Sequence, residues 1–156
     1  MSESEAQRFA SEFSRNVLLR LNTPRLAVRY GNSLSFAFPL LEGEVNMGDL
    51  MLVEALKVFY PRHYELIKHK STYFLSSYDN HSGNILDNKE AKKKKLEEHL
   101  EILAKSLTNK EKRAVLNLLK ELFPRLKEAF DNTFYHKGPL EWYKAKRIVS
   151  PEYFNR

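Results

Sequence analysis

The sequence predicts an all-α fold: an irregular bundle of about six to eight helices with a long central loop. Three observations support this prediction. Only 5 glycines and 6 prolines occur in 156 residues, too few for the many turns of a β fold. Apolar residues recur every three or four positions along most of the chain, the period of an amphipathic helix. Several of these periodic segments begin at a residue that caps helices well.

The first two helices are predicted from caps and apolar spacing. Ser2 and Glu5 have capping-box spacing, and the helix they open runs to residue 21 with an apolar face of Ala6, Phe9, Phe13, Val17 and Leu21. Thr23 is a good N-cap, and Pro24 suits the first position of a second helix. This second helix should end near Pro39, and its apolar face is Leu26, Tyr30, Leu34, Ala37 and Phe38.

A third helix is expected after a loop at residues 40–45. Asn46 can cap it, and Asp49 lies in its first turn, where a negative charge suits the helix dipole. The segment that follows has a broad apolar face, and Pro61 breaks or restarts the helix, which then continues to residue 70. Residues 71–87 are rich in turn-forming residues, so we predict a loop joining sub-halves of about 1–70 and 88–156 within one helical domain, residues 1–156.

The second half is predicted to contain a charged helix, a capped helix and an aromatic tail. Asp87 or Asn88 opens the charged helix, which runs through residue 107. Thr108 and Glu111 form a second capping-box pattern, and the helix they open is interrupted at Pro124. The aromatic and basic residues of the tail, 134–156, are expected to pin this segment onto the core, and a short helix should start at residues 150–152.

A faint internal repeat relates residues 55–65 to residues 118–128. Leu, Lys, Pro, Arg and Glu coincide in the two segments, and each lies at nearly the same distance from a cap. An ancient duplication would explain the repeat. Two helices that independently restart at a proline would explain it equally well.

The sequence contains no complete catalytic or nucleotide-binding motif. Cysteine is absent, which excludes disulfides and thiolate chemistry, and the 5 histidines lack metal-ligand spacing. Gly43 and Gly48 have the spacing of P-loop glycines, but Asp49 and Leu50 stand where Lys and Ser or Thr are required. No segment reaches the roughly 20 apolar residues that span a bilayer, and the polar N-terminus is unlike a secretory signal, so a cytoplasmic location is expected.

Two basic segments are candidates for binding an anionic partner. The net charge is +6, and the candidate residues are Lys92, Lys93, Lys94, Lys95, Lys144, Lys146 and Arg147. Bound nucleic acid would account for them, because lysine and arginine neutralise phosphates and the neighbouring aromatics could stack on bases. A solvated helix start for the first group and core packing for the tail are the simpler interpretations, so nucleic acid is not the favoured partner.

Three segments resemble a known family. They are residues 22–34 (NTPRLAVRYGNSL), residues 43–61 (GEVNMGDLMLVEALKVFYP) and residues 146–154 (KRIVSPEYF). Together they resemble the region that follows the nucleotide-binding core in P-loop NTPases of the KAP family. Residues 71–107 match no pattern of this family, and the matched pieces make up a minority of the chain.

The resemblance implies a non-catalytic helical segment, a lid or accessory part, of a larger ATPase. The ATP and Mg²⁺ of such a protein would bind to an upstream P-loop domain of the same polypeptide, and this chain would hold no cofactor itself. Family members are often associated with membranes. The abrupt ending of this chain is expected of a piece of a longer protein.

Lids in related NTPases use an arginine at a helix start to contact nucleotide phosphates. The resemblance therefore implies that Arg25, with Arg29 one turn later, is the phosphate contact.

Two other functions remain open from the sequence. The chain could be a stand-alone helical module that binds a protein partner, or a basic helical domain that binds nucleic acid. Steep loss of binding with added salt would favour the latter, since phosphate contacts release counterions.

Overall fold

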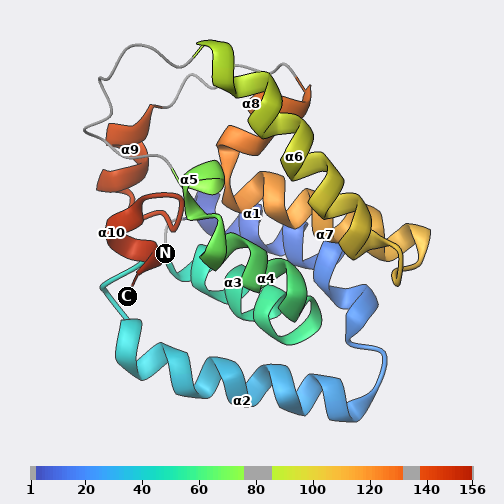
Figure 1. The fold of residues 1–156 in the computed structure, drawn as a ribbon. Helices are drawn as coiled ribbons and strands as arrows, with labels where there is room; N and C mark the ends of the chain where they lie inside the picture. The colour runs from blue at the N-terminus through green and yellow to red at the C-terminus, as the bar shows by residue number, and fades with distance from the viewer. Residues whose placement is uncertain (1–2, 76–85, 132–137, 156) are drawn as a thin grey trace.

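The computed structural model describes residues 3–75, 86–131 and 138–155, and it confirms the predicted all-α bundle (Figure 1). These residues form ten α-helices and no strand. The number exceeds the predicted six to eight because both proline breaks separate distinct helices and because three short helices occur. The element bounds are α1 Glu3–Glu12, α2 Pro24–Leu41, α3 Met47–Phe59, α4 Pro61–His69, α5 Ser71–Phe74, α6 Leu86–Ala104, α7 Asn109–Leu122, α8 Pro124–Asp131, α9 Pro139–Lys144 and α10 Pro151–Phe154.

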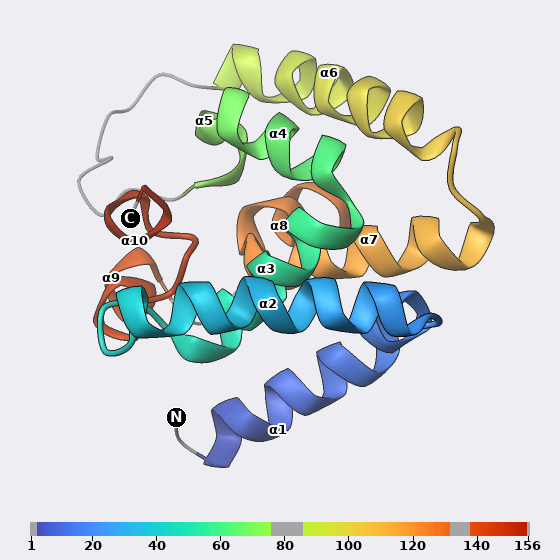
Figure 2. The same cartoon turned by 90° about the horizontal axis from the view of Figure 1, so that it is seen from below.

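Helix α3 is the centre of the fold. It packs against α1, α2, α4 and α7, and Figures 1 and 2 show these helices around it. Its side chains are apolar on nearly every side, and Leu52, Ala55 and Leu56 are fully buried. A helix that is hydrophobic all round must be covered on all sides. The broad apolar face seen in the sequence therefore predicts its central position.

Side-chain caps start three helices where the sequence predicted them. Thr23 Oγ1 accepts a hydrogen bond from the Leu26 N–H at 3.3 Å, and Asn46 Oδ1 accepts one from the Asp49 N–H at 3.1 Å. Thr108 and Glu111 form a complete capping box at the start of α7. Ser2, the remaining predicted cap, lies outside the described residues.

Several predicted helix ends differ from the structure. Helix α2 continues through Pro39 to Leu41, two residues beyond the predicted end, although Pro39 has no N–H to donate to the Ser35 carbonyl. The first predicted helix is not uniform: α1 ends at Glu12 and continues as a π-turn, Phe13–Val17, and a 3₁₀ turn, Leu18–Arg20. The predicted loop of residues 71–87 contains α5 and the first residues of α6, and its residues 76–85 lie outside the described residues.

The internal repeat corresponds to a repeated local structure. Helix α3 has 13 residues and α7 has 14, and each is followed by a helix that begins at a proline. The aromatic residue between them leaves the helical conformation in both copies, with φ −135° and ψ 56° at Tyr60 and φ −125° and ψ 83° at Phe123. Proline disfavours the helical conformation of the residue before it, which ends α3 and α7 at the same place.

One main hydrophobic core draws on both halves of the chain. Leu52, Leu56 and Ile67 lie in it together with Leu118 and Leu122 from the second half. The tail also joins it, as the sequence favoured, through the buried residues Trp142, Ile148 and Val149. A smaller cluster of Ala37, Val45 and Leu50 holds the end of α2 near the start of α3.

Candidate functional site

The inner face of helix α2 attaches this helix to the core. Tyr30 and Ala37 are buried, and the Tyr30 hydroxyl donates to the Met51 carbonyl oxygen at 2.9 Å. Leu26 and Leu34 pack against the core from the same side. These residues are the apolar face that the sequence predicted, so the opposite side of α2 must face outward.

The outward face of α2 combines two arginines with three large apolar side chains. At 100° per residue, Arg25, Val28, Arg29, Phe36 and Leu40 fall within a stripe about 120° wide. All five are exposed, and Val28, Phe36 and Leu40 retain 61%, 75% and 62% of their possible exposure. We call these five residues the α2 outer face. Figure 2 shows α2 running along the outside of the bundle.

Arg25 and Arg29, the predicted phosphate contacts, lie one turn apart on this face. The structure shows no hydrogen bond or ion pair from either guanidinium group to another described residue. Arg25 also lies in the first turn of α2, where no acidic residue is present and a positive charge opposes the helix dipole. Neither arginine therefore stabilises this domain through an ion pair with another described residue.

The candidate basic residues lie on separate elements. Lys94 and Lys95 are exposed on α6, and Lys93 is partly buried with its Nζ 5.9 Å from the ring centre of Phe130. The Lys92 side chain lies outside the described residues. The tail lysines are also exposed: Lys144 is the last residue of α9, and Lys146 lies in the turn that follows it.

Arg147 differs from the other tail residues of the proposed anionic-partner patch. Its side chain is only 14% exposed, and its Nε donates to Asp49 Oδ2 at 2.5 Å. Its Nη2 donates to the Glu121 carbonyl oxygen at 2.9 Å. The guanidinium group therefore binds two partners inside the fold, whereas a contact with an external anion would require it to be free.

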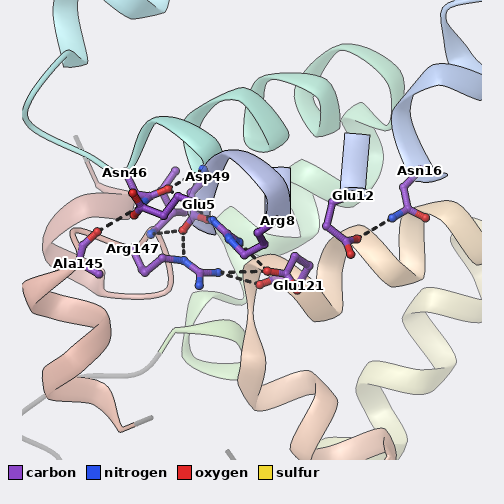
Figure 3. Close-up of polar contacts among 10 residues, drawn as sticks. Glu5, Arg8, Glu12, Asn16, Asn46, Asp49, Glu121, Ala145 and Arg147 are labelled. Atoms are coloured by element: carbon purple, nitrogen blue, oxygen red, sulfur yellow. Dashed lines mark hydrogen bonds and ion pairs between the residues drawn. The ribbon is translucent and has the colours of Figure 1, made fainter. Parts of the chain in front are cut away.

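Asp49 is the centre of a polar network that joins four segments (Figure 3). Its fully buried carboxylate accepts hydrogen bonds from Arg8 Nη2 at 2.8 Å, from Arg147 Nε at 2.5 Å and from the Ile148 backbone N–H at 3.0 Å. Arg8 Nη1 also donates to Glu121 Oε1 at 2.5 Å. Helices α1 and α3 and the turn after α9 thus meet at the Asp49 carboxylate, and Glu121 joins α7 to the network through Arg8 and Arg147.

This network was not predicted from the sequence. The sequence marks Asp49 as a favourable charge in the first turn of a helix and as a mismatch to the P-loop pattern. The available signal is its position in a mostly apolar segment, because a buried carboxylate needs cationic partners. Neither Arg8 nor Arg147 could be identified as those partners, since they lie 41 and 98 residues away along the chain.

A cavity of about 650 Å³ lies beside this network. Its wall includes Arg8, Lys144 and Arg147, and also Glu5 and Glu141. Both arginines already bind Asp49, and the two glutamates add negative charge, so the wall does not favour an anion. We interpret the network as a structural clamp.

Other kinds of site are not found in the described residues. Among residues 3–75, 86–131 and 138–155, no group of three or more His, Asp or Glu side chains is arranged to hold a metal ion. None of the helices in these ranges is both long and apolar enough to cross a bilayer.

Comparison with models of known protein families, with curated proteins and with solved structures finds no match for this chain.

Proposed function

We propose that this chain is a non-catalytic helical accessory part of a larger P-loop NTPase of the KAP type. In this proposal the α2 outer face docks on the nucleotide-binding domain, with Arg25 and Arg29 directed toward the nucleotide phosphates. The chain itself would bind neither ATP nor Mg²⁺. The docked position of α2 would depend on which nucleotide is bound. A change in that position would alter the binding of a partner.

The observation that carries the proposal is the composition of the α2 outer face. Arg25 and Arg29 have no visible partner among the described residues, and a guanidinium group is well suited to the spread charge of a phosphate. Of the three segments that resemble KAP proteins, residues 22–34 include the first half of this helix.

The apolar residues of the same face support docking on a protein surface. Val28, Phe36 and Leu40 are large, exposed and aligned along three turns of α2. Isolated apolar residues on a surface are ordinary, but three large exposed ones on one helix face, with the exposed Asn32 between Val28 and Phe36, favour a surface that another protein covers. Arginine and phenylalanine, both present on this face, are also enriched at the centres of protein interfaces.

The test is to change Arg25 and Arg29 in the full-length gene product. If these guanidinium groups stabilise charge on the phosphates, Arg25→Ala and Arg29→Ala should each lower ATP turnover by about tenfold or more. Arg113→Ala provides the matched control, because Arg113 is an exposed arginine on α7, away from the α2 outer face. Turnover equal to that of the control in both variants would reject the phosphate contact.

Phe36→Asp separates docking from phosphate contact. A carboxylate at this position should weaken the association of the helical domain with the nucleotide-binding domain, because the docked side chain would lose its apolar environment. Analytical ultracentrifugation of the two parts, expressed separately, measures that association. Unchanged association would show that the α2 outer face is not the docking surface.

The stand-alone protein-interaction module remains the alternative, and the same three apolar residues favour it. In that case Phe36→Asp would abolish binding of a separate protein, while nucleotide would have no effect. The structure lends less support to nucleic-acid binding, because Arg147 is bound within the fold and the remaining basic residues lie on separate elements.

A further inference from the structure

Helix α2 has positive charges near its start and a negative charge at its end. Arg25 and Arg29 are exposed in its first two turns, and Glu42 is exposed immediately after its last residue, Leu41. The helix itself contains no aspartate or glutamate. This order of charges opposes the helix dipole, which is positive at the N-terminal end and negative at the C-terminal end. Within one copy of the chain the arrangement is therefore unfavourable.

A second α2 that lies antiparallel to the first makes the same charges favourable. The cationic end of each helix then meets the C-terminal end of the other, where the dipole is negative and Glu42 is exposed. A two-fold axis produces this contact twice, because the same patch is used on both copies. A parallel copy would bring like charges together, so the charge order favours an antiparallel one.

Asn32 lies in the middle of the α2 outer face and suits the position of the two-fold axis. It is exposed, four residues after Val28 and four before Phe36. With the axis at Asn32, Phe36 of one copy lies at the level of Val28 and Arg29 of the other. The apolar side chains then cover each other, and the guanidinium group of Arg29 can lie over the Phe36 ring. The two Asn32 amides can pair, since each has donors and acceptors, and an asparagine between paired helices fixes their register.

We infer that the α2 outer face pairs with the same face of a second copy of this chain, in an antiparallel dimer centred on Asn32. Helix α2 runs along the outside of the bundle, where a second copy can approach it (Figures 1 and 2). A single pair of helices makes a small interface, so we expect a dissociation constant on the order of 10–100 μM.

Pairing and the docking proposed above use one face and therefore exclude each other. A paired α2 would hold Arg25 and Arg29 away from a nucleotide until the two copies separate. This consequence rests on the proposed function, whereas the pairing itself does not.

Sedimentation equilibrium of the 156-residue chain, without nucleotide or any other protein, measures the pairing. Phe36→Asp should weaken it by about tenfold or more, because the pairing would bury a carboxylate among apolar side chains. Circular dichroism checks that this variant and those below remain helical. A parent chain that stays monomeric at a concentration well above the expected dissociation constant would overturn the inference.

A charge exchange tests the antiparallel arrangement. Arg25→Glu and Glu42→Arg should each weaken pairing by about three- to tenfold, because like charges then meet at both ends of the dimer. The double variant should return to within about twofold of the parent, since each end again has opposite charges. Arg113→Glu, on α7, is the control for the change in net charge and should leave pairing unchanged. A double variant as weak as the single ones would contradict the antiparallel arrangement.

An introduced thiol tests the register, because the chain contains no cysteine. Asn32→Cys should form a disulfide-linked dimer on mild oxidation, since its two copies lie at the two-fold axis. Arg25→Cys should not, because residue 25 lies about 10 Å along the helix from the axis, which places its two copies about 20 Å apart. Equal rates of linkage in the two variants would overturn the proposed register.

These outcomes can be told apart from those of the docking tests. A monomeric chain that still docks on the nucleotide-binding domain would reject the pairing alone. A dimeric chain whose Arg25→Ala and Arg29→Ala variants keep full ATP turnover would reject only the phosphate contact.

Discussion

At the scale of single residues, two buried titratable groups have opposite environments. Asp49 is fully buried, and two arginines and a backbone N–H surround its carboxylate. His63 is nearly as buried, and burial, together with the like charge of Arg62, lowers its pKa to about 4. Burial disfavours the charged form of a group, and no opposite charge offsets this effect among the causes acting on His63.

Asp49→Asn tests the clamp at its centre. An asparagine has nearly the same shape, but it leaves two arginines without their buried counter-charge, so the free energy of unfolding should fall by about 3 kcal/mol. Urea denaturation measures this change. Glu42→Gln, at an exposed site, is the control and should change it by less than about 0.5 kcal/mol. A loss below about 1 kcal/mol for Asp49→Asn would show that the network adds little stability.

His63 should make stability depend on pH in a defined window. Its pKa is about 4 in the folded chain and 6.5 when unfolded, so between these values the unfolded chain binds a proton that the folded chain does not. Stability should therefore be full above about pH 6.5 and decrease as the pH falls toward 4. The loss between pH 7.5 and pH 5, measured by urea denaturation, should be about 2 kcal/mol smaller in His63→Gln than in the parent.

The exposed His69 provides the comparison for this measurement. His69→Gln should retain the pH dependence of the parent chain, because the His69 side chain is 74% exposed and lies outside the core. If His63→Gln and the parent lose equal stability between pH 7.5 and pH 5, the imidazole of His63 is not kept neutral by burial.

At the scale of elements, helix α2 has two faces with different roles. Tyr30 lies in the core, with its ring centre 5.6 Å from that of Phe59, whereas Phe36 is among the most exposed apolar residues described. The helix starts with a cap and a proline that need no tertiary contact. Its inner face is thus sufficient to hold it on the bundle, and its outer face is available to a partner.

Substitutions on the two faces should therefore differ in their effect on stability. Tyr30→Ala should lower the free energy of unfolding by about 3–5 kcal/mol, since it removes a buried ring and leaves a cavity. Phe36→Ser should change it by less than about 0.5 kcal/mol, because the ring contributes little to the core. Thermal unfolding followed by circular dichroism compares them, and a large loss for Phe36→Ser would place that side chain in the fold instead of at a docking surface.

At the scale of the whole molecule, the two halves share one core. Leu56 from the first half and Leu118 from the second lie in the same cluster, and the Asp49 clamp links α1, α3, α7 and the tail. The ring of Phe123 lies 5.5 Å from that of Phe74 and 6.1 Å from that of Phe154, between centres. Neither sub-half buries its apolar residues without the other.

This shared core should make unfolding a single cooperative transition. Leu56→Ala and Leu118→Ala should each lower the free energy of unfolding by about 2–5 kcal/mol and leave one transition. Fluorescence of Trp142, the only tryptophan, reports on the tail, while circular dichroism reports on all helices. The two signals should change at the same urea concentration, and two separate midpoints would indicate independently folding halves.

The sequence by itself determined the all-α class, the three side-chain caps and the inward faces of most helices. These features depend on residues within one or two turns of each other, so spacing along the chain is enough to identify them. The breaks before Pro61 and Pro124 belong to the same group, since a proline acts on its immediate neighbour.

Only the tertiary structure decided which charges pair and where cavities remain. Arg147 is one of several basic residues in the tail, and nothing local distinguishes it from Lys144 or Lys146. It becomes part of the clamp because the fold brings its guanidinium group to Asp49, which lies 98 residues away along the chain. Burial and ion pairing depend on contacts between segments that are distant in the sequence. A sequence can therefore predict that a buried charge needs a partner, but the packing of the helices determines which residue is that partner.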